Sequence, residues 1–403
     1  MSAIGGVVDF KNKRVDFSEL NSIRRSMSLR GREGSAAFLC GGAGMVFNSS
    51  VFYAENDALR QPYIQQRRGR ALALCIDSDG IDPRAVGEKY FVHGTDFLGC
   101  IDGGFALSLY DEERDILLLA RDRCAKKPLF YSVREDKIYF ASEPKGIIDA
   151  CGGSVNISRD VIGYHLIAPM GVYRASSVYT DICEVLAGEC VVFSNFGISK
   201  FFFRKNREAS RIKVRNAGGS TKENIVSAYP RFDNEKLGDY LNDALIAFDY
   251  PQFDCFMPFL SELFLKARSQ GKQSVIFEDI VRRKNLAYAR EREDRLGAIC
   301  GIRAIGAFSG AKPTFSDDAI DALDNALSER FFSLPPYERN LLRDIFDQYR
   351  LDCLLKMLSL PIKKEDTEQK IRILGMLCQT IEWIQARELR FVGQSREYSA
   401  YSV

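Results

Sequence analysis

Short apolar or alternating runs follow one another through the first half of the chain, and this pattern predicts β-strands. Polar stretches at 111–114 and 194–197 each separate two such runs, so we expect a hairpin turn at each place. The clearest runs are ALALCID (71–77), FALSLY (105–110), DILLLARD (115–122) and KIYFASE (137–143).

A strand is also expected at the very start, where the chain reads MSAIGGVVDF. A helix should follow it. Ser18 can cap this helix, and Leu20, Ile23 and Met27 form an apolar stripe at helical spacing.

The pattern changes after residue 204. Residues 204–224 are basic, polar and glycine-containing, which is typical of a linker or mobile loop. Beyond about residue 235 the spacing is mainly helical, and QSVIF (273–277) is the one strand we expect there. We therefore expect a β-rich domain over 1–205, a linker over 206–230 and a mostly helical domain over 231–403. The helices are expected over 317–327, behind a Ser316 cap and with Ile320, Leu323 and Leu327 on one face, and over 341–360 and 369–389.

Composition places the chain among globular proteins. It has 403 residues, of which 46% are hydrophobic and 27% charged, and a net charge of only +2. This charge gives no field that would attract nucleic acid or an anionic membrane, and no apolar run is long enough to span a bilayer. The 11 cysteines are odd in number and have no CxxC spacing, so we expect reduced thiols in a cytoplasmic protein. With only two histidines, no metal site is expected.

Residues 94–148 carry the most specific pattern in the chain. The run GTDFLGCIDGGFALSLYDEERDILLLARDRCAKKPLFYSVREDKIYFASEPKGII resembles the block LDGxFAFxLxD…ARDRxGxKPLYY…FASExK of the glutamine-dependent asparagine synthetase family. Three flanking segments support the resemblance, and together they cover about the first 200 residues. They are MSAIGGVVDF, MSLRGREG (27–34) and 164–203.

The resemblance implies an α+β protein with an N-terminal-nucleophile (Ntn) αββα sandwich. In this fold the chain terminus lies in the active site, which would explain a strand that starts at once. The second half resembles the family more weakly: 311–323 is similar to VPFLDxxLVEFAL, and 333–346 to SLPP…KxLLRxAF. It would be a truncated, degenerate α/β synthetase-like domain.

The glutaminase positions depart from the family pattern. Ser2 stands where the family has a cysteine nucleophile, whose thiol is more acidic than a hydroxyl. The YNGEIYN segment, whose amide would build the oxyanion site, becomes CIDSDGID, which contributes Asp77, Ser78 and Asp79. A carboxylate at Asp77 has the wrong charge for stabilising an oxyanion. The substrate-binding arginine has no counterpart in VFNSSVF (46–52), so we expect no glutaminase activity.

The nucleotide positions depart further. The nearest match to the pyrophosphate loop SGGLDS is Gly218, Gly219 and Ser220, in a polar stretch more typical of a linker. FEDIVRRKNLAY (277–288) keeps Asp279 and Tyr288 of SGDGGDELFGGY, but the later acids that would bind Mg²⁺ become arginines. We expect Arg282, Arg283 and Lys284 on a solvated helix face beside AREREDR (289–295). Arg339 takes the place of the catalytic lysine in KxLLR.

Four functions remain open from the residues. The favoured one is a pseudoenzyme that acts as a binding or scaffold subunit in a biosynthetic pathway, with no cofactor and with a protein partner or a homodimer. The runner-up is an amide-bond-forming ligase or cyclase that would need ATP and Mg²⁺. A Ser2-dependent Ntn hydrolase and simple asparagine synthesis fit less well. The retained residues Arg121, Asp122, Arg123, Lys127 and Pro128 are expected to serve the fold and the interface between the halves.

Overall fold

The structure is a computed structural model of the whole chain. It describes residues 1–50, 60–67, 69–78, 80–153, 155–167, 177–204, 233–272, 274–276, 286–305, 317–360, 366–386 and 390–392. The predicted linker at 206–230 lies outside these residues.

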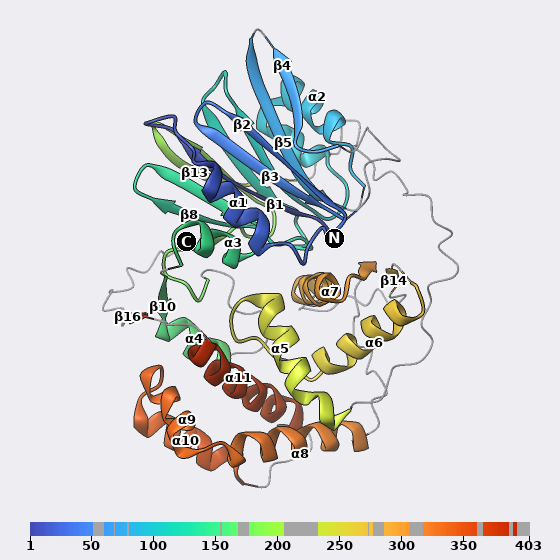
Figure 1. Cartoon of the computed structure of the whole chain (residues 1–403), viewed down its shortest axis with the longest axis vertical. Helices are drawn as coiled ribbons and strands as arrows, with labels where there is room; N and C mark the ends of the chain where they lie inside the picture. The colour runs from blue at the N-terminus through green and yellow to red at the C-terminus, as the bar shows by residue number, and fades with distance from the viewer. Residues whose placement is uncertain are drawn as a thin grey trace.

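Two six-stranded antiparallel sheets form the first half (Figure 1). The first sheet has the order β11 (Cys183–Glu184), β8 (Phe130–Arg134), β9 (Lys137–Ala141), β1 (Ala3–Asp9), β3 (Ala43–Ser49) and β2 (Gly34–Cys40). The second has the order β13 (Gly197–Phe202), β12 (Glu189–Ser194), β7 (Ile116–Arg121), β6 (Phe105–Asp111), β5 (Arg70–Ser78) and β4 (Tyr63–Arg67). The strands and both hairpins expected from the sequence are confirmed.

The two sheets pack face to face with helices outside. Between them lies a core to which Ile4 and Phe47 contribute from the first sheet, and Cys75 and Leu119 from the second. Helices α1 (Phe17–Ser26) and α3 (Pro144–Ala150) cover the outer face of the first sheet. The second sheet is covered by α2 (Pro83–His93) and the 3₁₀ helix η3 (Gly94–Cys100). The predicted αββα sandwich is confirmed.

The first helix begins two residues earlier than expected. Its cap is Asp16, whose carboxylate accepts a hydrogen bond from the Ser18 backbone amide at 2.9 Å, while Glu19 completes a capping box. Ser18 is therefore not the cap. Leu20, Ile23 and Met27 are buried against the sheet, as predicted.

The described part of the second half is mostly helical, as expected, and it surrounds its own apolar core. QSVIF forms β14 (Ser274–Ile276), but it is not alone: β14 pairs in parallel with β15 (Arg303–Ile305), across α7. The helices are α5 (Leu237–Phe248), α6 (Met257–Ser269), α7 (Leu286–Cys300), α8 (Asp317–Ser333), α9 (Pro336–Asn340), α10 (Gln348–Leu358) and α11 (Thr367–Ala386), with the 3₁₀ turns η5 (Asn234–Lys236) and η6 (Leu341–Asp344).

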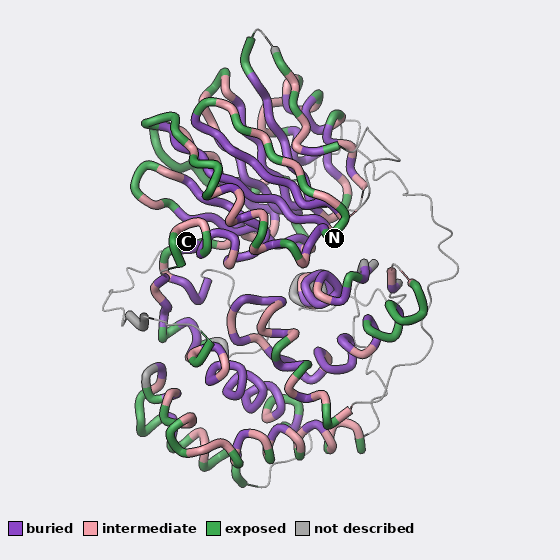
Figure 2. Tube along the Cα trace, viewed as in Figure 1, coloured by how far each residue is buried: buried purple, intermediate pink, exposed green. Residues whose placement is uncertain are grey.

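The two halves meet at several places, among them Lys145 at the start of α3, which pairs with Asp249 just after α5 at 3.3 Å. Near the chain's end, β16 (Arg390–Val392) pairs in parallel with β10 (Asn156–Ser158), and α4 (Arg159–Ile167) packs on α11. At another place, α7 lies against the edge of the sandwich where the N-terminus sits, and much of it is buried (Figures 1 and 2).

All 11 cysteines carry free thiols, and six of them are buried. None of the described helices combines the length and apolar character that crossing a membrane requires.

Candidate functional site

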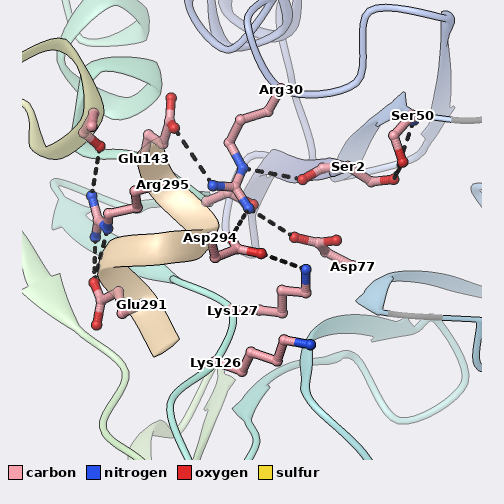
Figure 3. A network of polar contacts seen from close by, with 12 residues as sticks. Ser2, Arg30, Ser50, Asp77, Lys126, Lys127, Glu143, Glu291, Asp294 and Arg295 are labelled. Carbon is pink, nitrogen blue, oxygen red and sulfur yellow. Dashed lines mark hydrogen bonds and ion pairs between the residues drawn. The ribbon is translucent and has the colours of Figure 1, made fainter. Parts of the chain in front are cut away.

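The chain start lies where β1 and β3 meet a buried arginine (Figure 3). The Ser2 hydroxyl is 3.2 Å from the hydroxyl of Ser50, and it accepts a longer hydrogen bond, 3.4 Å, from the Ser50 backbone amide. The Ser2 carbonyl accepts a hydrogen bond from Nε of Arg30 at 3.1 Å. The start of β1 is thus fixed by a guanidinium that is itself fully buried.

Asp77 binds the same guanidinium from the second sheet. It stands near the end of β5, and its carboxylate accepts a hydrogen bond from Nη2 of Arg30 at 3.1 Å. The other carboxylate oxygen has no hydrogen-bond partner among the described residues. The neighbouring Ser78 accepts from the Ile81 amide at 3.0 Å, and Asp79 lies outside the described residues.

Helix α7 completes the cluster from the second half of the chain. Asp294 accepts from Nη2 of Arg30 with one carboxylate oxygen and from Nζ of Lys127 with the other, each at 2.6 Å. Arg30, Lys127, Asp77 and Asp294 are each at most 2% exposed in their side chains. Glu143, whose Oε1 lies 3.8 Å from Nη1 of Arg30, adds a third buried carboxylate, so the two cations lie among three acids at the boundary between the halves (Figure 3).

Two neighbouring residues of α7 extend this polar contact. Glu291 binds Arg121 of β7 at 2.8 Å and Arg295 of its own helix at 2.7 Å. Arg292 binds Asp254 within the second half at 2.7 Å. Arg282, Arg283 and Lys284, for which a solvated helix face is expected, lie outside the described residues. The neighbouring charges at 292–295 are buried, each against a partner or close to one.

The pairing of Arg121 and Lys127 across the halves confirms the interface role predicted for them. Asp122 has a local structural role instead. Its carboxylate accepts from the backbone amides of Phe105, Cys124 and Lys126, which holds the loop after β7 in place.

The two carboxylates on Arg30 differ in their acidity. Burial tends to raise the pKa of Asp294, but Lys127 and Arg30 outweigh it and lower this pKa to about 2. Burial dominates at Asp77 and raises its pKa, against the opposing effect of Lys127 and Arg30. Asp294 is therefore the firmly ionised partner of the two cations, and Asp77 is the first of the two to take up a proton.

The Met1 amino group lies beside this cluster. Burial and the positive charge of Lys127 lower its pKa to about 5, so the amine is neutral at pH 7. The Met1 side chain reaches α7, where its Cε atom lies 2.8 Å from the position that a Cβ on Gly297 would take. With Met1 in place, the nitrogen of Ser2 belongs to a peptide bond and has no lone pair for general-base work.

The arrangement brings Ser2 and Asp77 together through Arg30, but not the other predicted residues. Gly218, Gly219, Ser220 and Asp279 lie outside the described residues, and of Tyr288 only its place in α7 is described. Arg339 lies on α9, at the far end of the molecule from the N-terminus (Figure 1). Within the described ranges, no three His, Cys, Asp or Glu side chains are grouped so as to hold a metal ion.

Comparison with known proteins finds similarity within the first half of the chain. Residues 81–203 match the model of a glutamine amidotransferase domain. Asparagine synthetase B (glutamine-hydrolyzing) of Escherichia coli is 26% identical over 170 residues, which cover 38% of this chain, and asparagine synthetase 3 (glutamine-hydrolyzing) of Bacillus subtilis is 28% identical over 120 residues, 29% of this chain. The chain is a divergent asparagine synthetase-like protein.

The likeness covers only part of each relative. The matched segments of this asparagine synthetase-like chain span 30% and 19% of the length of those two enzymes. The domain match begins at residue 81, so Ser2, Arg30 and Asp77 lie before it. A solved structure of glutamine phosphoribosylpyrophosphate amidotransferase from B. subtilis, complexed with ADP and GMP, is 12% identical and aligns with 75% of this chain and 65% of its own length. Its TM-score of 0.33 is too low to support a shared arrangement of the whole chain.

Sequence reasoning missed two members of the cluster. Arg30 lies within MSLRGREG, a segment that contributes to the family resemblance, and an arginine between apolar and glycine residues is a candidate for burial. Asp294 lies in a run of seven residues with six charges, which looks solvated. Only the density of opposite charges in that run hinted that it needs partners.

Proposed function

We propose that this asparagine synthetase-like protein does not hydrolyse glutamine and acts as a binding or scaffold subunit in a biosynthetic pathway. One observation supports this above the others: the carboxylate of Asp77, buried and bound to Arg30, stands at the position where the resemblance expects an amide donor. An oxyanion needs preorganised N–H donors, and a second anion there opposes the charge that develops in acyl transfer.

The surroundings of Ser2 support the same proposal. Its hydroxyl contacts another hydroxyl and a backbone amide, and neither group is basic enough to take its proton. A scaffold role fits the contacts of α7, whose ion pairs hold the two halves in one fixed relation.

The first test measures glutamate release from glutamine by the purified full chain, with the glutamine-hydrolyzing E. coli enzyme as positive control. Intact mass determines beforehand whether Met1 is present, so that the result refers to a known N-terminus. We expect no glutamate above the buffer blank, and none from an Asp77→Asn variant with Ser2 intact. Glutamine-dependent glutamate release that disappears in Ser2→Ala would overturn the proposal.

The second test addresses the alternative function, an ATP-dependent ligase. The parallel strands β14 and β15, with α7 between them in the chain, favour this alternative because α/β nucleotide-binding domains are built from such β-α-β units. Calorimetric titration with ATP and Mg²⁺, with ADP as comparison, separates the two functions. We expect no heat of binding up to millimolar nucleotide. Metal-dependent ATP binding would replace the scaffold proposal with an ATP-dependent amide ligase.

A further inference from the structure

Helix α10 has two apolar faces, only one of which meets the core. Leu351 and Leu358 are buried in the second half's core. On the opposite side, Tyr349, Cys353 and Met357 follow one another at intervals of four residues, which places them on one solvent-facing stripe. Tyr349 is 77% exposed and Met357 61%, and Cys353 is also exposed. Figure 2 shows α10 as a largely exposed edge of the molecule.

This stripe is larger than a single exposed side chain. Leu360, one turn beyond Met357 and 53% exposed, extends it past the end of the helix. Scattered apolar residues are normal on a protein surface, whereas a continuous apolar strip along one helix is typical of a contact site. The stripe therefore needs a partner of matching length and chemistry.

Charges beside the stripe indicate which partner fits. Asp352 and Lys356, both exposed, form one flank at a spacing of four residues. Among the residues that the structure describes, neither has an ion-pair partner on a different element. An acid and a base four residues apart are self-complementary when the same helix meets them in the opposite direction.

We propose that α10 docks on α10 of a second copy of this chain, antiparallel and about a two-fold axis. A two-fold axis perpendicular to the helices places the same flank of both copies side by side. Asp352 of each copy then faces Lys356 of the other, so two ion pairs border the apolar contact. Cys353 lies within one residue of the level of the axis, which brings the two copies of this thiol close together.

The interface is small, and the dimer should be weak. A helix of 11 residues is about 16 Å long, so the contact falls short of the roughly 1,600 Å² of a standard protein interface. We expect dissociation in the micromolar range. Helix α10 lies far from the N-terminus (Figure 1), so this contact is independent of whether the chain hydrolyses glutamine.

The decisive experiment is a charge swap followed by sedimentation analysis of the full chain. Asp352→Lys and Lys356→Asp each place like charges opposite one another, so each alone should weaken self-association at least about tenfold. An equimolar mixture of the two variants should restore it, because one copy then offers two cations and the other two anions along the flank. Thermal unfolding should be unchanged in both, since the residues are exposed.

A short bis-maleimide cross-linker provides an independent measurement. We expect a covalent dimer from the wild type that Cys353→Ser abolishes, while the same change at the exposed Cys124 leaves it intact. A chain that stays monomeric at about 200 µM, above the expected dissociation range, would overturn the proposal. So would a dimer that neither charge variant weakens. If a different protein covers the stripe, the purified chain would stay monomeric at this concentration.

Discussion

The strongest consequence of the buried cluster concerns Asp294. Replacing it by asparagine keeps its shape but removes the charge that binds Arg30 and Lys127, each at 2.6 Å. The lowering of its pKa from 3.8 to about 2 corresponds to about 2.5 kcal/mol. Loss of one partner from a buried pair costs about 3–5 kcal/mol, because the remaining charges are left uncompensated. We therefore expect Asp294→Asn to lower the free energy of unfolding by about 2–5 kcal/mol.

The assay is equilibrium unfolding in urea. The single tryptophan, Trp383, is buried in α11 beside Tyr179 and reports on the packing of the two halves. The matched control is Asp136→Asn, which removes an exposed ion pair with Lys11 at 3.0 Å and should cost less than about 1 kcal/mol.

The pH dependence provides a second check. The folded-state pKa of Asp294 lies below its ordinary value of 3.8, so its contribution is fully present above about pH 4 and is lost as the pH falls toward 2. The difference between wild type and variant should shrink over that range. A loss below about 1 kcal/mol at pH 7, or a difference that does not change with pH, would show that the cluster is not the ionised network described.

Three further outcomes are expected. Asp77→Asn should cost far less than Asp294→Asn in the same urea assay, because burial raises the pKa of Asp77 and its charged form is already penalised; an equal loss would contradict the unequal roles of the two acids. Burial and the neighbouring Asp239 raise the pKa of Asp243 to about 6, so ionisation of this carboxyl lowers the free energy of unfolding as the pH rises through 6. Asp243→Asn should therefore stabilise the protein at pH 8, by about 1–2 kcal/mol after solvent screening, and should have no such effect at pH 4. Ala125 has a φ of 49°, where a Cβ is unfavourable, so Ala125→Gly should raise the free energy of unfolding by up to about 1 kcal/mol. The control is Ala150→Gly at the end of α3, which should lower the free energy of unfolding.

The sequence predicted the sandwich well because its strands alternate or run apolar between clear turn residues. ALALCID and FALSLY became β5 and β6 with few changes at their ends. The error at the first helix was small: Asp16 and Ser18 are both good caps, and the capping box with Glu19 decided between them. Such local competition is visible in the sequence but is settled by the backbone path.

The candidate site was harder to foresee. Asp77 was identified from the resemblance alone, whereas its ion pair with Arg30 depends on two strands that are distant in sequence. Asp294 is 264 residues away from Arg30 along the chain, and no spacing rule connects such residues. Charged residues pair in space, so a run such as AREREDR looks solvated until a partner surface with opposite charges is known.

The burial of α7 has a consequence for how the chain can be dissected. A fragment that ends before residue 205 would keep Arg30, Arg121 and Lys127 in the apolar edge of the sandwich but lose Glu291 and Asp294. Arg30 would keep Asp77 and Glu143, and Arg121 would keep Glu184, but Lys127 would lose Asp294 and Arg121 would lose Glu291. The surface of the fragment would therefore be more positive here than the contact in the intact chain. The charges of α7 and those at the edge of the sandwich are desolvated together only when the two halves pack against each other. This couples the folding of one half to that of the other. An amidotransferase fragment studied alone would thus be a different molecule at the very place where its chemistry is to be judged.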